Sequence, residues 1–261
     1  MLFCGCYFKF MSNLSDIGFP VQSEQDVNGL IEDLLSVVKP THCKQGAYYI
    51  YSDASGAEMY LQGNAGDELI GFNPHYAGKS RRAVCLTAMI ERDSSELDGG
   101  FHAWANPSDA SDPESGDYPF VFDAPDFRTY MNSQFPRACD IQLTAFASND
   151  FKIYPSETDY YASQIDEPKI AAKSFVPSAL LGAVENANEP PRPIGMFAGE
   201  IKAFELKRNE RTKANFYWFL VETLGGEVDV VADPKLIAGE PQIGGIVSGQ
   251  FWLSGRLIEK Q

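Results

Sequence analysis

The sequence predicts a mainly β (α+β) protein, in which an N-terminal helix packs on an antiparallel sheet and a small β-barrel follows. Three observations predict this fold. The 261 residues are enough to bury a core without disulfide or metal staples. One helical pattern of apolar residues lies near the N-terminus. After it, short aromatic and β-branched runs alternate with turn residues.

The clearest helix is expected over 24–39. Apolar residues at positions 27, 30, 31, 34, 35 and 38 have the spacing of a single helix face. Ser23 is a suitable N-cap, the acids Glu24 and Asp26 complement the positive end of the helix, and Pro40 ends the pattern. We therefore expect this helix to cover one side of a sheet.

From residue 46 onward the pattern is that of a β-meander. The expected strands are rich in aromatic and β-branched residues, and clusters of Gly, Asn, Asp and Ser separate them. They lie at 47–51, 58–61, 68–72, 83–90, 101–105, 120–123 and 140–147.

The last part of the chain has its own strand pattern. Strands are expected at 194–206, 214–223 and 227–232, followed by a connection and by strand segments at 244–247 and 250–257. Three meandering strands, a connection and two more strands resemble the five-stranded OB-fold, which implies an OB-like β-barrel here. Segments such as Asp16–Pro20 and Asp98–Pro107 resemble an uncharacterised bacterial protein family, a resemblance that implies no activity.

These patterns divide the chain into four expected parts. Residues 1–11 are predicted to be disordered or an upstream extension, because Met11 opens a more ordinary start for a soluble protein. Residues 12–154 are expected to form the α+β sheet domain. Residues 155–193 form a Pro-rich connecting segment, and 194–261 form the OB-like barrel.

Composition excludes several functional classes. Lys plus Arg is 21 against 36 for Asp plus Glu, a net charge of −15 that argues against duplex nucleic acid and anionic membranes as partners. No apolar run approaches the roughly 20 residues that span a bilayer. The five cysteines are odd in number and scattered, which favours a reducing, cytoplasmic location. No cofactor motif or metal-ligand spacing is visible, so we expect neither a cofactor nor a metal site.

The densest polar cluster is expected in a loop at 73–82. Gly78-Lys79-Ser80 has the end of a phosphate-loop motif, but the preceding glycine is at the wrong spacing and Pro74 removes an amide donor. Arginine and lysine here could still bind a carboxylate or phosphate, or they could pair with nearby acids. The cluster contributes five candidate ligand-binding residues, namely Asn73, His75, Lys79, Arg81 and Arg82.

A second candidate surface is the strand at 101–105. His102 and Trp104 are two residues apart, so they share one face of the strand, and histidine can carry a proton near neutral pH. A hydrogen-bonded structural histidine is the simpler interpretation. The acidic run at 109–117 does not match a calcium loop and is expected to be a solvated loop.

Together these features predict a non-enzymatic binding module for a macromolecular partner, such as a protein. One alternative is a small-molecule-binding protein or an enzyme whose site combines the 73–82 loop with His102 and Trp104. The other is binding of single-stranded nucleic acid by the C-terminal barrel, through aromatic residues such as Trp218 and the basic residues that flank the strands.

Overall fold

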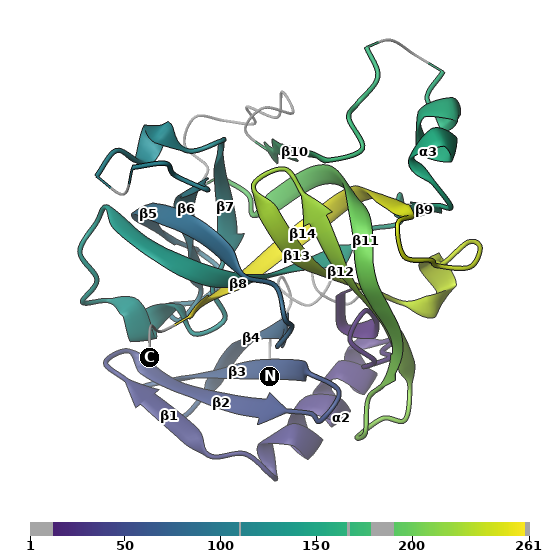
Figure 1. The fold of residues 1–261 in the computed structure, drawn as a ribbon. Helices are drawn as coiled ribbons and strands as arrows, with labels where there is room; N and C mark the ends of the chain where they lie inside the picture. The colour runs from purple at the N-terminus through teal and green to yellow at the C-terminus, as the bar shows by residue number, and fades with distance from the viewer. Residues whose placement is uncertain (1–12, 110, 166–167, 179–190, 259–261) are drawn as a thin grey trace.

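The computed structural model describes residues 13–109, 111–165, 168–178 and 191–258 (Figure 1). The predicted extension at 1–11, with Cys4 and Cys6, lies outside the described residues. The protein is mainly β, as predicted, with one four-stranded sheet and one ten-stranded sheet. No helix in the described ranges is long and apolar enough to cross a membrane.

The regular elements follow one another closely along the chain. In order they are α2 (Glu24–Leu35), β1 (Pro40–Cys43), β2 (Gly46–Ser52), β3 (Ala57–Asn64), β4 (Leu69–Tyr76), β5 (Arg82–Glu91), β6 (Gly99–Ala105), η1 (Pro113–Ser115), β7 (Pro119–Asp123), η2 (Phe127–Tyr130), β8 (Arg137–Ala147), β9 (Lys152–Tyr154), α3 (Glu157–Ser163), β10 (Ser174–Pro177), β11 (Ile194–Arg208), β12 (Asn215–Thr223), β13 (Gly226–Ala232), η4 (Pro234–Leu236) and β14 (Ile246–Ile258).

Helix α2 begins where the sequence predicts. The side chain of Ser23 accepts a hydrogen bond from the backbone N–H of Asp26 at 3.2 Å, which satisfies one free donor of the first turn. The helix ends at Leu35, earlier than the predicted residue 39. Pro40 opens β1 and disfavours helical backbone in Lys39, so the helix cannot extend to the predicted end.

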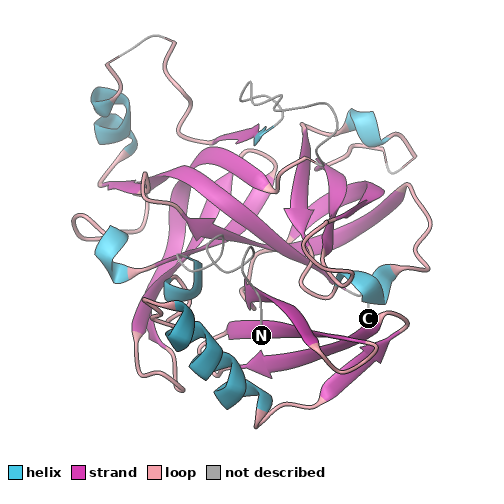
Figure 2. Cartoon of the chain, turned by 180° about the vertical axis from the view of Figure 1, so that it is seen from behind, coloured by secondary structure: helices cyan, strands magenta, loops and turns pink. Residues whose placement is uncertain are grey.

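Helix α2 and the sheet β1-β2-β3-β4 form a layer beside the large sheet (Figure 2). Val27, Ile31 and Leu34 of the helix are buried in one apolar cluster with Met59 of β3 and Trp252 of β14. This cluster also contains aromatic residues of β8 and β12. The predicted packing of an N-terminal helix on an antiparallel sheet is therefore confirmed, and the same cluster attaches this layer to the rest of the protein.

The large sheet closes on itself twice. Strand β11 pairs with β12, β12 with β13, β13 with β8, β8 with β14, and β14 again with β11. A second ring passes from β8 through β5, β6 and β7 to β14. The ring that contains β11, β12 and β13 is compatible with the barrel-like fold that the sequence predicts for the C-terminal part of the chain, whereas the sequence does not predict that the β5–β8 ring closes. The two rings share β8 and β14, which cross the middle of Figure 1. One continuous apolar cluster runs through both rings.

The two rings are related by an approximate two-fold arrangement of strands. There are two units of four strands, β5–β8 and β11–β14. The first strand, β5 or β11, pairs antiparallel with the second and the fourth strand of its own unit. The third strand, β7 or β13, pairs parallel with the fourth strand of the other unit. Thr144 of β8 lies opposite Ser254 of β14 at the centre. Asp229 pairs with Thr144 and Asp123 pairs with Ser254, so these two aspartates occupy equivalent positions.

Several local expectations need correction. The expected strand segments at 244–247 and 250–257 are one strand, β14, which continues through Gly249. Residues 73–76 of the expected loop at 73–82 belong to β4, where Pro74 is tolerated because β4 is an edge strand of its sheet. The segment 155–193 contains α3 and β10, and strands on both sides of it share the large sheet.

Candidate functional site

Two of the sequence-predicted site residues, Asn73 and His75, are buried between the two sheets. Asn73 donates to the carboxylate of Asp98 at 2.9 Å. The ring nitrogens of His75 lie 2.9 Å from Ser254 Oγ and 2.8 Å from Gln142 Oε1. Complete burial, together with the nearby Arg256 guanidinium, lowers the pKa of His75 to about 3, so the ring is neutral at pH 7. Both residues therefore hold the sheets together.

The backbone amides of the Gly78-Lys79-Ser80 segment bind the side-chain carboxylate of Asp229, a residue of the same chain. The backbone N–H groups of Lys79 and Ser80 donate to Asp229 Oδ1 and Oδ2 at 2.9 and 2.8 Å. A Cβ atom on Gly78 would lie 2.0 Å from Asp229 Cγ, so only glycine allows this close approach. The amides that resemble a phosphate loop are thus occupied by an internal carboxylate.

Two side chains complete the shell around Asp229. Trp218 Nε1 donates to Oδ1 at 2.7 Å, and Gln142 Nε2 donates to Oδ2 at 2.8 Å. Trp218 is only 3% exposed, so its ring is not a stacking platform at the surface of the described structure. The Lys79 ammonium lies 5.0 Å from the centre of the Trp218 ring and covers it.

The neighbouring arginines at 81 and 82 have opposite environments. Arg81 is exposed and forms an ion pair of 2.6 Å with Asp140. Arg82 is 1% exposed, and no carboxylate of the described residues pairs with it. Its guanidinium instead donates to Tyr118 Oη, to Thr223 Oγ1 and to the carbonyl of Gly226, at 2.8, 2.6 and 2.8 Å. Arg82 therefore ties β5 to the turn between β12 and β13.

Replacing Arg82 by methionine is expected to lower the free energy of unfolding by about 2–3 kcal/mol, because it leaves buried hydroxyl and carbonyl groups without their charged donor. Urea denaturation measures this loss. The matched control is Arg81→Met, one residue earlier, for which a loss below about 1 kcal/mol is expected because the Arg81 ion pair is exposed. Equal losses in the two variants would contradict this assignment.

His102 and Trp104 share a half-buried face of β6, as expected from their spacing. His102 Nδ1 lies 2.5 Å from Thr87 Oγ1, and burial lowers the pKa of the imidazole. Trp104 lies opposite Cys85 of β5. None of the seven predicted site residues lines any of the cavities described below.

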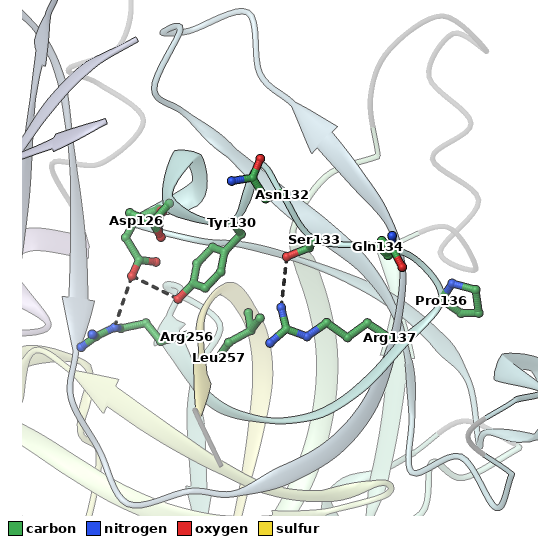
Figure 3. Close-up of a pocket in the computed structure, with 10 residues that line it drawn as sticks. Asp126, Tyr130, Asn132, Ser133, Gln134, Pro136, Arg137, Arg256 and Leu257 are labelled. Carbon is green, nitrogen blue, oxygen red and sulfur yellow. Dashed lines mark hydrogen bonds and ion pairs between the residues drawn. The ribbon is translucent and has the colours of Figure 1, made fainter. Parts of the chain in front are cut away.

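The largest of these cavities, about 750 Å³, lies at one end of the β5–β8 ring. It is formed by η2, by the loop that follows it and by the ends of β8 and β14 (Figure 3). The lining is predominantly polar and comprises Asp126, Thr129, Tyr130, Asn132, Ser133, Gln134, Pro136, Arg137, Arg256 and Leu257. Arg137 donates to Ser133 Oγ at 3.0 Å, which positions its guanidinium (Figure 3).

Arg256 and Asp126 form a loose pair in this cavity. Arg256 Nε lies 3.9 Å from Asp126 Oδ2, which accepts a hydrogen bond of 3.2 Å from Tyr130 (Figure 3). Arg256 Nε and Asp126 Oδ1 are buried and have no hydrogen-bond partner among the described residues. Burial raises the pKa of Asp126, and the Arg256 charge offsets part of this effect. Arg256 also contacts the Glu58 carboxylate at 3.4 Å.

A second cavity, of about 500 Å³, adjoins the first. The two share Thr129 and Asn132, and the second is completed by His42, Cys43, Lys44, Gln45, Arg128 and Met131. Arg128 is engaged by Glu91 at 2.7 Å. Lys44 and Arg137 form no ion pair with any other described residue. Each cavity therefore contributes one unpaired cation.

Sequence reasoning missed these residues. Lys44, Arg137 and Arg256 are far apart in the chain, and each is a single basic residue in an ordinary turn or strand. Their one local signal is a basic residue at a strand end, which is common. Only the pairing of β8 with β14, and the position of the loop 131–136 above it, brings Arg137 and Arg256 into one cavity.

The chain was compared with known protein families, curated proteins and solved structures. None of the three comparisons finds a match.

Proposed function

We propose that this protein is a non-enzymatic binding module that holds a ligand with more than one anionic group in the two adjoining cavities. The observation that carries this proposal is a pair of cations without carboxylate partners. The protein has a net charge of −15, yet Lys44 and Arg137 of the cavity linings form no ion pair with any described residue. The other two lining cations are already paired, Arg128 with Glu91 and Arg256 with Glu58 and Asp126. On a protein this acidic, cations without carboxylate partners are unusual and suit an external anion.

The chemistry of the lining supports the same class of ligand. Arginine offers several N–H donors in a planar fork that matches carboxylate or phosphate oxygens, and lysine offers a compact point charge. Asn132 belongs to both cavities, and its side-chain amide can donate a further hydrogen bond. Because Thr129 and Asn132 line both cavities, we expect one molecule with two anionic groups to reach Lys44 in one cavity and Arg137 in the other.

Isothermal titration calorimetry at low ionic strength tests this proposal with citrate, pyrophosphate and inorganic phosphate as probes. Citrate and pyrophosphate are expected to bind more tightly than inorganic phosphate, and added NaCl should weaken their binding. Arg137→Gln is expected to raise the Kd for citrate about 10-fold or more, because a charge-assisted hydrogen bond contributes about 1.5–3 kcal/mol. Lys44→Gln should raise the Kd for citrate as well.

Arg81→Gln is the matched control, because Arg81 is an exposed arginine that lines neither cavity. It is expected to leave the Kd for citrate unchanged. Absence of binding for all three probes, or an equal loss of affinity in Arg81→Gln and Arg137→Gln, would refute the proposal. The macromolecular partner that the sequence predicts stays a prediction, since these probes test the site and not the partner.

A further inference from the structure

A separate cavity of about 400 Å³ brings together three distant segments of the chain. Its lining comes from the residues before α2, from the loop after β8 and from η4 and the residue preceding it. The residues are Ser15, Asp16, Ala147, Ser148, Asn149, Asp233, Lys235 and Leu236. It shares no lining residue with the two cavities of the proposed function.

The central feature of this cavity is the carboxylate of Asp16, which is 1% exposed. Its Oδ1 accepts a hydrogen bond of 2.7 Å from the backbone N–H of Asp233. Its Oδ2 is buried and has no hydrogen-bond partner among the described residues. A buried carboxylate oxygen without a partner is costly, because it loses the hydration that it has in the unfolded chain. A bound cation would replace that hydration.

A second carboxylate stands in the same cavity. Asp233 Oδ1 accepts a hydrogen bond of 2.8 Å from the backbone N–H of Lys235 at the start of η4. Ser148 and Asn149 add a hydroxyl and an amide oxygen to the lining. The lining contains no histidine or cysteine, so the side-chain donors are oxygens, the atoms that calcium and magnesium prefer.

We infer that this cavity binds a hard divalent cation of the calcium or magnesium class, with Asp16 and Asp233 as its carboxylate ligands. Among the described residues no group of three or more His, Cys, Asp and Glu side chains is placed to share a metal ion. Calcium and magnesium also take amide, carbonyl, hydroxyl and water oxygens, so two carboxylates are sufficient for a weak site.

The charges of the protein have two opposite effects on the binding of a cation in this cavity. The net charge of −15 raises the local concentration of cations at the protein surface. Lys235 is exposed at the edge of the cavity, and its ammonium competes with a bound metal ion. Removing the charge of Lys235 should therefore strengthen binding, whereas removing the charge of Asp16 should abolish it. A metal-binding site predicts these two opposite effects on metal binding, whereas a carboxylate with a purely structural role predicts neither.

The test is thermal unfolding of the whole protein with CaCl2 or MgCl2 at about 10 mM, compared with NaCl at equal ionic strength. Sites with few carboxylate ligands have a Kd of about 10⁻⁴ to 10⁻³ M. At that Kd, either divalent salt should raise the Tm by about 3 to 10 °C above the NaCl reference. Isothermal titration calorimetry with the same salts should give one site per chain.

Three variants make the result specific. Asp16→Asn keeps the Oδ1 acceptor for Asp233 and is expected to lose the Tm rise. Lys235→Gln is expected to lower the Kd for the metal about 2- to 5-fold, as one competing charge near a surface site is removed. Asp140→Asn changes a partly exposed aspartate outside the cavity and is expected to keep the full rise. The inference is overturned if neither salt raises the Tm above the NaCl reference, or if Asp16→Asn keeps the rise.

Discussion

Replacement of Asp229 by alanine is expected to lower the free energy of unfolding by about 4 kcal/mol or more, because four hydrogen-bond donors lose their buried acceptor. Asp229 is fully buried and each of its oxygens accepts two hydrogen bonds, one from a backbone N–H of the 79–80 segment and one from the Trp218 or Gln142 side chain. Each buried donor left unpaired costs about 1–3 kcal/mol. The whole protein is stabilised by only about 5–15 kcal/mol.

Urea denaturation at pH 7.5 measures this loss. Asp140→Ala is the matched control, because Asp140 is a partly exposed aspartate paired with Arg81, and a loss below about 1 kcal/mol is expected. Asp229→Asn should give an intermediate loss, because the amide keeps one acceptor oxygen and turns its NH2 group toward two donors. A loss for Asp229→Ala no greater than that for Asp140→Ala would show that the four hydrogen bonds do not stabilise the fold.

Acidification from pH 7.5 to pH 4.5 is expected to remove about 2.5 kcal/mol of stability through His75 alone. Burial lowers the pKa of His75 to about 3 in the folded protein, whereas an unfolded histidine has a pKa of about 6.5. Between these two values the unfolded chain binds one more proton than the folded protein. The free energy of unfolding therefore falls by about 1.4 kcal/mol for each pH unit below 6.5.

The His75→Gln variant isolates this effect, since glutamine retains polar groups but does not titrate. Its free energy of unfolding should depend less steeply on pH than that of the wild type, by about 2.5 kcal/mol over the interval from 7.5 to 4.5. His42→Gln removes an exposed histidine and should keep the wild-type pH dependence. If His75→Gln and the wild type lose stability in parallel, His75 is not the source of the acid sensitivity.

The fold class could be predicted because its signals are local. Apolar periodicity and the Ser23 cap determine where α2 begins, and aromatic and β-branched runs bounded by turn residues mark most of the strands. The short strands β1, β9 and β10 have only three or four residues, and each is held in place by pairing with a neighbouring strand. Their residues alone carry too little pattern to predict them.

The candidate cavities could not be predicted, because their residues meet only through long-range pairing. Arg137 and Arg256 come from strands whose pairing joins residues more than a hundred positions apart. The residues that local sequence singled out have another explanation. Asn73, His75 and Arg82 are polar because they connect buried layers, and the Gly78 turn is polar because it receives Asp229. The sequence shows which residues are polar, but not the distant residues with which they form hydrogen bonds.

The sharing of β8 and β14 by both rings determines when this protein can fold during synthesis. The first ring needs β14, whose residues 246–258 leave the ribosome long after the rest of that ring. The nascent chain therefore exposes the open edges of β7 and β8 until β14 is synthesised, a state in which unpaired strands can aggregate. We expect that neither half folds as an independent domain, because β8 of the first half and β14 of the second half belong to both rings.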